Sequence, residues 1–315
     1  MEKPLISIVI PVKNGEKTIQ KCLDAIKIQS LFNQSEVIII DSGSIDRTLE
    51  ILNDYPYIRI FKIKPEEFNH GATRNYGVSL ANGEFVVMTV QDAWASNNNW
   101  LEIMYSHFKD EKVVAVVGQQ VVPHEKGINP HQWYRPVSKP RLIEIYFENP
   151  VEYLQLSGKE QDEQIFYDDV NTMYRKSALI EIPFEKMEFG EDMLWMKTAI
   201  SKGYKAVYDA RSSVWHYHFQ DKGYVYRSTF TLMYFKYLIF GYIPVYKYRL
   251  KDLSLIVFRN FKFKVHFKWI FHNITILMST KRAYNEFIKY HEQGIEILKN
   301  YYKKLNPSVI QGKSK

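Results

Sequence analysis

The stretch FNHGATRNYGVSLANGEFVVMTVQDA (residues 68–93) decides the fold of this chain. It predicts a loop, a short helix, a turn at Asn82-Gly83 and a buried strand over 85–90 that stops at Gln91-Asp92. A continuous apolar strand is typical of an α/β sheet covered by helices on both faces. Ligands of such sheets bind beyond the carboxyl ends of the strands, which is where Asp92 falls. We therefore expect a metal ion or a sugar diphosphate beside Asp92.

The sequence before this stretch alternates strands and helices with short connections. Such alternation predicts a parallel, right-handed, nucleotide-binding half. No G-x-G-x-x-G follows the first strand, so the dinucleotide-binding class is not indicated. The expected elements are a strand over 5–12, a helix over 18–28, a strand over 36–40, a helix over 47–52 and a strand over 57–63.

The sequence after Asp92 predicts further elements of the same sheet. Prolines at 123, 130, 136, 140 and 150 predict that 119–165 is irregular, as an insertion on the acceptor side. From Tyr224 onward the chain is helical in character. The expected elements between these points are a helix over 100–108, strands over 113–117 and 165–174, a helix over 191–201, and strand segments over 205–208 and 214–218.

Charge is distributed unevenly along the 315 residues. Residues 221–315 hold 18 Lys and Arg against 5 Asp and Glu, whereas the remainder is mildly acidic. The single cysteine, Cys22, excludes an intrachain disulfide framework and fits a reducing compartment. No nucleic-acid-binding module is recognisable, and the apolar, aromatic content of the basic tail favours an anionic membrane surface instead.

Six segments occur in the order typical of one enzyme family. They are SIVIPVKNGEKTI, VIIIDSGSIDRT, GATRNYGVSLANGEF, VQDA, FGEDMLWMKTAISKGY and VWHYH, within about residues 4–218. Together they resemble glycosyltransferase family 2, the inverting nucleotide-sugar enzymes with a GT-A fold. FNHGATRN with QDA, and DVNTMYRKSALIEIPF, resemble more narrowly the bacterial rhamnosyltransferases that use dTDP-L-rhamnose to build cell-surface polysaccharide such as O-antigen or capsule.

The resemblance implies an α/β chain with a GT-A type, Rossmann-like sheet flanked by helices. We expect a catalytic domain over residues 1–220, with a nucleotide-binding half at 1–118 and an acceptor-side half at 119–220. Residues 221–315 are expected to form a basic, aromatic-rich helical appendage. The reaction that the resemblance implies transfers a sugar from a dTDP- or UDP-sugar to a saccharide acceptor, expected to be linked to polyprenyl diphosphate.

A metal site is implied at the end of the fourth strand. Most family members carry Asp-x-Asp there, whereas this chain has Val90-Gln91-Asp92, so one carboxylate remains. Asp92 is an oxygen ligand suited to Mg²⁺ or Mn²⁺. The resemblance adds a histidine as second ligand, His216 or His218, and we expect at most one of them, preferably His216, to enter the site. The alternative is that both are histidines packed by Trp215 and Tyr217.

The donor nucleotide is expected at the loops that follow the strands. The resemblance implies that Asp41 accepts the N3–H of a uracil or thymine ring. The alternative is helix capping, but Ser44 and Asp46 are better placed to cap the next helix, which leaves Asp41 free. Arg74 is predicted to bind phosphate bidentately, against the alternative of a surface or helix-start arginine. The complete set that the resemblance implies for the nucleotide sugar is Pro11, Asn14, Glu16, Asp41, Arg74, Gln91 and Asp92.

Inversion needs one carboxylate base, because it is a single displacement without a covalent intermediate. Glu191-Asp192 matches the base motif of the family, and we assign the base to Asp192 and a loop-holding role to Glu191. The alternative is that the pair caps the helix that follows.

The tail raises the question of membrane contact. Residues 228–246 are apolar, but Lys236, Gly241 and Pro244 interrupt them, and the segment FRNFKFKVHFKWIFHNITILM (258–278) has the composition of a helix lying in the headgroup plane. We expect docking on the inner face of the cell membrane, in the cytoplasm. The alternative is a helical subdomain that packs on the body or forms a homodimer, with these aromatics as its core.

Two rival functions remain at this point. One is the same fold with a UDP-sugar donor, such as UDP-N-acetylglucosamine or UDP-galactose. The other is a non-catalytic, glycosyltransferase-like scaffold subunit, which the loss of the first aspartate of the metal triplet keeps open.

Overall fold

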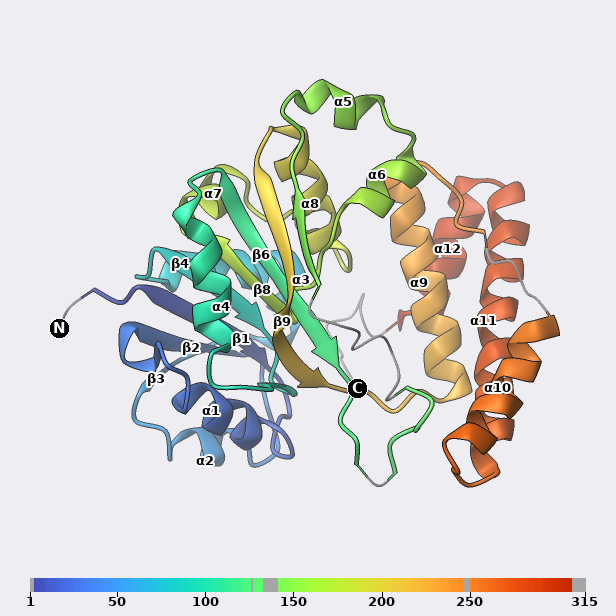
Figure 1. Cartoon of the computed structure of the whole chain (residues 1–315), viewed down its shortest axis with the longest axis horizontal. Helices are drawn as coiled ribbons and strands as arrows, with labels where there is room; N and C mark the ends of the chain where they lie inside the picture. Colours follow the sequence, from blue (N-terminus) through green and yellow to red (C-terminus); the bar gives the residue numbers. More distant parts are fainter. Residues whose placement is uncertain (1–2, 126, 133–140, 246–249, 308–315) are drawn as a thin grey trace. The chain divides into compact units, whose positions relative to one another are not determined.

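The computed structural model describes residues 3–125, 127–132, 141–245 and 250–307. The strands in these ranges are β1 (Ile6–Val12), β2 (Ser35–Asp41), β3 (Ile58–Lys62), β4 (Phe85–Thr89), β5 (Ala93–Ala95), β6 (Val113–Val121), β7 (Leu142–Ile145), β8 (Asn171–Arg175) and β9 (Lys205–His216). They form one mixed sheet in the order β3-β2-β1-β4-β8-β6-β9-β5, with β7 paired to β9 (Figure 1).

The first half of the sheet has the predicted topology. Strand β1 pairs in parallel with β2 and β4, and β2 pairs in parallel with β3. The connecting helices are α1 (Ile19–Lys27), α2 (Thr48–Leu52) and α3 (His70–Leu80). The α/β class expected from the alternating pattern is therefore confirmed, with these strand and helix ends within about two residues of their predicted positions.

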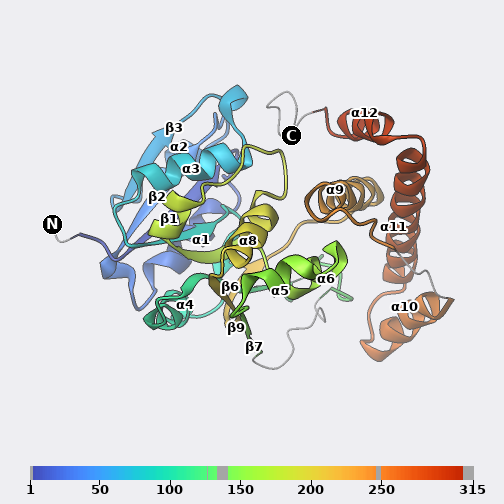
Figure 2. The same ribbon diagram turned by 90° about the horizontal axis from the view of Figure 1, so that it is seen from above.

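Helices cover both faces of the sheet, because successive strand residues point to opposite sides. Ile8 and Ile10 pack in one core with residues of α1 and of α4 (Trp100–Ser106). On the other face α3 approaches so closely that a Cβ added to Gly77 would lie 2.3 Å from Val9. Figures 1 and 2 show α4 and α3 on these two sides.

The second half of the sheet mixes directions. Strand β8 is antiparallel to both β4 and β6, whereas β9 runs parallel to β6. The expected strand over 165–174 begins only at Asn171, because a turn occupies the residues before it. The two segments expected near 205 and 214 are one continuous strand, β9. Helix α8 (Glu191–Ser201) spans the residues predicted for it.

The prediction that 119–165 is irregular is wrong for part of that range. It contains the end of β6, strand β7 and two helices, α5 (Pro150–Gln155) and α6 (Gly158–Gln164). Pro150 does not break α5 but begins it, since proline at the first helical position loses no hydrogen bond. Pro136 and Pro140 lie outside the described residues.

Two compact units divide the chain. The first comprises Met1–Val121 and Ser138–Tyr217, and it contains the sheet. It also contains α7 (Lys176–Glu181) and the short 3-10 helices η1 (Phe32–Gln34), η2 (Pro65–Glu67) and η3 (His107–Lys109). The second comprises Val122–Val137 and His218–Lys315, so the segment 122–137 groups with the C-terminal helices.

The second unit is built on α9 (Lys222–Phe240), α10 (Leu250–Lys262), α11 (Lys268–Glu292) and α12 (Ile295–Leu305). Its core is aromatic: Phe230 packs edge-on against Phe287 at 5.5 Å, and Tyr234 stacks on Tyr302 at 4.5 Å between ring centroids. Six of the hydrophobic residues over 228–245 are thus buried, namely Phe230, Met233, Tyr234, Phe235, Ile239 and Phe240. Within the described part of the chain, no helix is both long enough and apolar enough to cross a bilayer.

Candidate active site

The candidate residues gather where the parallel strands end. Asp41 is the last residue of β2, and Asp92 follows β4 by three positions. Strand β8 is antiparallel to β4, so it begins where β4 ends, and Asn171 pairs with Thr89. The Asp168-Asp169 pair just before β8 therefore lies at the same edge of the sheet as Asp41 and Asp92.

Asp192 joins this edge through the start of α8. Gly190 precedes the helix in a left-handed conformation (φ 81°), so Glu191 and Asp192 occupy its first turn. The backbone N–H of Asp169 donates to Asp192 Oδ2 at 3.4 Å. The register of the sheet and this hydrogen bond thus bring residues 41, 92 and 192 to one edge from distant parts of the chain.

Asp92 and His216 form the core of a candidate metal centre. Strand β5 pairs with β9 so that Ala93 lies opposite His216, which sets Asp92 beside the same imidazole. His216 Nε2 is 3.6 Å from Asp92 Oδ1. His218 follows two residues later, and one ligand atom from each of the three side chains lies within 4.8 Å of the others.

The expectation that at most one histidine enters the site, preferably His216, stays a prediction. Strand β9 ends at His216, which lies beside Asp92, and His218 belongs to the irregular segment that follows. One carboxylate oxygen and two imidazole nitrogens can hold a divalent ion, of which the carboxylate suits Mg²⁺ or Mn²⁺. The donor set therefore fits the metal that the sequence implied.

Gln120 on β6 sets the tautomer of His216. Its Nε2 donates to both oxygens of Asp168, at 2.8 and 2.7 Å, and its Oε1 lies 2.6 Å from His216 Nδ1. An amide that donates to a carboxylate presents its oxygen to the ring, so Nδ1 carries the proton. In the neutral imidazole the lone pair is then on Nε2, which is the nitrogen that faces Asp92.

The two other positions of the triplet serve the protein itself. Gln91 Oε1 accepts the N–H of Lys13 at 2.8 Å, and Gln91 Nε2 donates to the Lys13 carbonyl at 3.0 Å. A carboxylate could not make the second bond. The Val90 side chain packs against the hydrophobic core. Gln91 therefore fixes the loop after β1, and Asp92 is the acidic member of the triplet.

Arg74 is buried among carboxylates. Only 7% of its surface is exposed, its Nε lies 2.7 Å from Asp169 Oδ2, and its Nη1 is paired with Glu191. Tyr174 donates its hydroxyl to the other oxygen of Asp169 at 2.5 Å. The surface-arginine alternative is thus excluded. Carboxylates already pair with Nε and Nη1, and the predicted phosphate contact of Arg74 stays a prediction.

Three carboxyl groups surround this one cation, and burial raises the pKa of each. The pKa of Asp169 is raised to about 8 and that of Glu191 to about 7, although Arg74 opposes both shifts. Burial also raises the pKa of Asp192 above its ordinary value. The cluster therefore holds protons at pH values where exposed carboxyl groups are fully ionised.

Of the neighbouring pair, Asp192 is the better placed to act as a base. Glu191 is buried (4% exposed) and paired with Arg74, whereas Asp192 retains solvent contact. Asp192 Oδ1 accepts the N–H of the next residue, Met193, at 2.8 Å. The N-cap position itself is Gly190, but Asp192 accepts an N–H of the first turn of α8. The helix-start alternative therefore describes part of what Asp192 does, and its role as base stays a prediction.

The loops after β1 and β2 are tied to each other. Asn14 Oδ1 accepts the N–H of Ile45 at 2.9 Å, and Glu16 Oε2 accepts that of Arg47 at 3.3 Å. In the other direction, Ser44 Oγ accepts the N–H of Asn14, and Asp46 Oδ2 accepts the N–H of Glu16. Pro11 lies within β1, opposite Ile40. These side chains build the rim of the edge described above, and their contact with a nucleotide stays a prediction.

Asp41 is not free, contrary to the expectation. It is 2% exposed, and its carboxylate accepts the N–H groups of Gly43 and Ser44 at 3.2 Å. A carboxylate has about four acceptor positions, so these two bonds leave capacity for a further donor. Its predicted bond to a pyrimidine ring remains open.

Sequence reasoning missed Gln120, Asp168 and Asp169. Asp169 begins the DVNTMYR segment that contributed to the family resemblance, and Asp168 precedes it, yet the pair was assigned no chemistry. Two adjacent aspartates immediately before a buried strand were the available signal, since the end of a strand needs no carboxylates. Gln120 carried no signal, because its role depends on the pairing of β6 with β8 and β9.

Comparisons with known proteins show the family of the chain. Residues 7–183 match the model of glycosyl transferase family 2. The chain is 31% identical over 219 residues to the O-antigen chain rhamnosyltransferase RfbN of Salmonella typhimurium, and 35% identical over 222 residues to WbaN of Salmonella anatum. Each match covers 68% of this chain, and 66% and 67% of the respective relatives, so the chain spans about two thirds of their length.

Solved structures agree at the level of the fold. The mannosyltransferase PcManGT from Pyrobaculum calidifontis, in complex with GDP-Man and Mn²⁺, aligns with a TM-score of 0.56 and 15% identity over 98% of this chain and 81% of that one. Staphylococcus aureus TarS 1-349 aligns at 0.52 and 16%, over 98% and 91%. Together with the sheet and its edge, these matches establish that the chain is a glycosyltransferase of family 2 with the GT-A fold.

Proposed function

We propose that this enzyme transfers L-rhamnose from dTDP-L-rhamnose, with inversion, to a saccharide acceptor linked to a lipid diphosphate in cell-surface polysaccharide synthesis. The observation that carries the proposal is the position of Asp192 beside the carboxylates and histidines of one sheet edge. The rhamnosyltransferase relatives and the FNHGATRN segment support the choice of sugar. The rival donor is a UDP-sugar.

The proposed reaction is one displacement at the anomeric carbon. Asp192 takes the proton of the acceptor hydroxyl while the oxygen of that hydroxyl forms a bond to the anomeric carbon. At the same time the bond between this carbon and the diphosphate oxygen breaks, and its electron pair leaves with dTDP. Burial supports this role, because a carboxylate with a raised pKa is a stronger base than an exposed one. Arg74 holds Glu191 and Asp169 around that base.

Asp92, His216 and His218 are proposed to hold Mn²⁺ or Mg²⁺. Such an ion supplies positive charge for the leaving diphosphate. The protein contributes the tautomer of His216, through Gln120, and the fixed position of Asp92, through the pairing of β5 with β9. Asp41 is proposed to accept a hydrogen bond from the pyrimidine ring, with Pro11, Asn14 and Glu16 lining the nucleotide.

A donor panel tests the proposal. The protein is incubated with dTDP-L-rhamnose, UDP-N-acetylglucosamine, UDP-galactose or GDP-mannose and Mn²⁺, and donor hydrolysis and thermal stabilisation are measured. We expect dTDP-L-rhamnose to be preferred, and a preferred UDP-sugar refutes the assignment of rhamnose. Asp192→Asn is expected to abolish turnover while it still binds donor. Retained turnover in that variant refutes the assignment of the base.

We also propose that the enzyme docks on the inner face of the cell membrane through the second unit. Four phenylalanines of α10 and the start of α11 are 59–74% exposed: Phe258, Phe261, Phe267 and Phe271. Exposed cations alternate with them, namely Arg259, Lys262, Lys264 and Lys268. This aromatic-basic face combines rings that insert at the interface with charges that attract anionic lipid.

Flotation tests the docking proposal. Vesicles of phosphatidylcholine, with or without phosphatidylglycerol, are mixed with wild type, with Phe258→Ser/Phe261→Ser, and with Ile28→Ser/Ile45→Ser, which removes two exposed apolar residues of the first unit. We expect salt-sensitive binding to the anionic vesicles, lost only in the phenylalanine variant. Equal binding by all three proteins argues against the face, and absence of binding argues against docking.

A further inference from the structure

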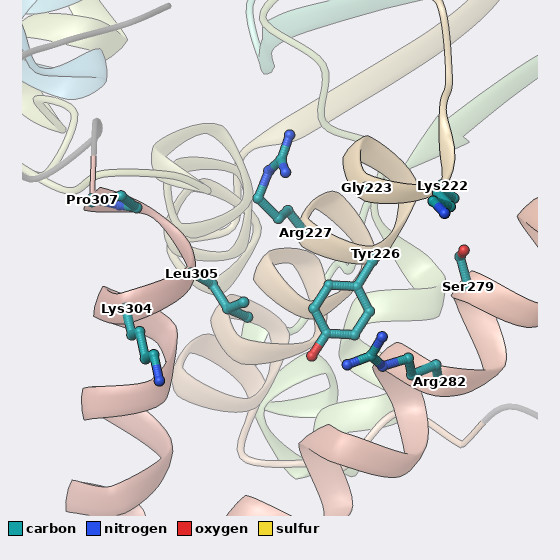
Figure 3. Close-up of a pocket in the computed structure, with 9 residues that line it drawn as sticks. All are labelled: Lys222, Gly223, Tyr226, Arg227, Ser279, Arg282, Lys304, Leu305 and Pro307. Atoms are coloured by element: carbon teal, nitrogen blue, oxygen red, sulfur yellow. The ribbon is translucent and has the colours of Figure 1, made fainter.

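A cavity of about 440 Å³ in the second unit is lined by cations from three helices. Lys222 and Arg227 come from the start of α9, Arg282 from the middle of α11, and Lys304 from the end of α12. Figure 3 shows Tyr226 and Arg282 facing each other, with Lys222 and Ser279 on one side and Lys304 and Leu305 on the other. None of the residues that line the cavity is acidic.

The acidic residues nearest to these side chains are already engaged. Asp221 caps α9 by accepting the N–H of Tyr224 at 2.7 Å. Glu286 accepts the Nε–H of Arg282 at 2.7 Å and the hydroxyls of Tyr226 and Tyr301. Burial opposes its ionisation, but these hydrogen bonds hold the pKa of Glu286 below its ordinary value. Glu286 therefore acts as a fixed anion behind Arg282.

The hydrogen bond to Glu286 orients the guanidinium of Arg282 and leaves most of its N–H donors available to a ligand. The bond to Glu286 uses only Nε, one of the five N–H donors of the guanidinium. The guanidinium carbon lies 5.1 Å from the centroid of the Tyr226 ring, which holds it from one side. Both Nη groups are thus positioned by the protein, and Arg227, Lys222 and Lys304 add three more charges around the same space. Four unit positive charges against the two carboxylates of Asp221 and Glu286 leave the cavity positive.

We infer that this cavity binds a phosphate or diphosphate group that carries an organic substituent. Arginine forks and lysine ammonium groups are the usual partners of phosphate oxygens. The space exceeds what a phosphate alone fills, and the Tyr226 ring, Leu305 and Pro307 offer apolar contact for the rest of the molecule. The site lies wholly within the second unit and does not depend on the donor sugar. Two sources share this chemistry, a lipid diphosphate and a free phosphorylated compound.

The variant Arg227→Gln/Lys304→Gln tests the cavity, and Lys299→Gln/Lys303→Gln is its matched control. Both remove two positive charges, and Lys303 and Lys304 are adjacent exposed residues of α12, but neither Lys299 nor Lys303 lines the cavity. Circular dichroism and donor binding confirm that each variant folds. Inorganic pyrophosphate is titrated calorimetrically, in EDTA so that no metal holds the diphosphate at the catalytic edge.

We expect wild type and the control to bind pyrophosphate with similar affinity, and the cavity variant to bind it at least about tenfold more weakly. A second arm uses phosphatidylcholine vesicles that contain farnesyl diphosphate. Recruitment of wild type and control, but not of the cavity variant, identifies a lipid diphosphate as the source, whereas binding of soluble pyrophosphate alone identifies a free compound. Equal behaviour of all three proteins in both arms, or no binding in either, overturns the inference. Neither arm measures sugar transfer, so failure here leaves the proposed function untouched.

Discussion

Replacing Arg74 with methionine is expected to destabilise the first unit in a pH-dependent manner. The side chain is buried, and its two partners, Asp169 and Glu191, have only 2% and 5% of their side-chain surface exposed. Removing one member of a buried ion pair costs about 3–5 kcal/mol, because the other charge stays buried without compensation. Methionine fills similar space, so the loss reports on charge more than on packing.

The sign of the pH dependence follows from the raised pKa values. A carboxyl group whose pKa rises on folding keeps a proton that the unfolded chain has released, so stability falls as pH rises toward the folded value. In wild type this loss is complete near the pKa values of about 7 for Glu191 and about 8 for Asp169. Without Arg74 both values rise further, so the loss continues at higher pH, by about 1.4 kcal/mol per pH unit for each retained proton.

Urea unfolding at pH 6 and pH 9, followed by tryptophan fluorescence, measures the effect. We expect Arg74→Met to lose about 1–2 kcal/mol at pH 6, where protonated carboxyl groups need no cation, and about 3–5 kcal/mol at pH 9. Arg47→Met is the control, since Arg47 pairs with Glu50 on the surface, and its unfolding midpoint should not move at either pH. An equal loss at both pH values would show that Arg74 contributes packing and not charge.

Three further perturbations test the site. Gln120→Leu removes the acceptor that fixes the proton on His216 Nδ1. Calorimetric titration with Mn²⁺ should show an affinity at least about tenfold lower than that of wild type, with Gln119→Leu as control. Unchanged affinity contradicts the tautomer argument. The acid limb of the kcat profile should lie above the ordinary pKa of an aspartate, since burial raises the pKa of Asp192; a limb at about 4 or below contradicts its role as base. Gly71→Ala should lower the stability measured by urea unfolding by about 1–3 kcal/mol, because the new Cβ would lie 2.0 Å from the backbone oxygen of Glu185, and a stability equal to wild type would mean that this loop yields.

Local features of the sequence determined most of the first half of the fold. A buried strand has a short apolar run in the sequence, and a helix has apolar residues at every third or fourth position. Strands β1 to β4 and helices α1 to α3 could therefore be predicted one at a time. Asp41 and Asp92 could be assigned to the ligand edge for the same reason, since parallel strands expose their carboxyl ends together. The weaker pattern after residue 119 misled, because a proline can begin a helix as well as end one.

Only the tertiary structure decided how the polar side chains of the site are used. Strand β8 runs antiparallel between β4 and β6, and this order brings Gln120, Asp168 and His216 into one hydrogen-bonded chain. Arg74 likewise meets Asp169 and Glu191 from 95 and 117 positions away, which places the arginine predicted to bind phosphate at the centre of a buried charge cluster. Short-range patterns record which residues are buried and in which element. The partner of a buried charge is set by strand order and register, and no local pattern in one sequence contains that information.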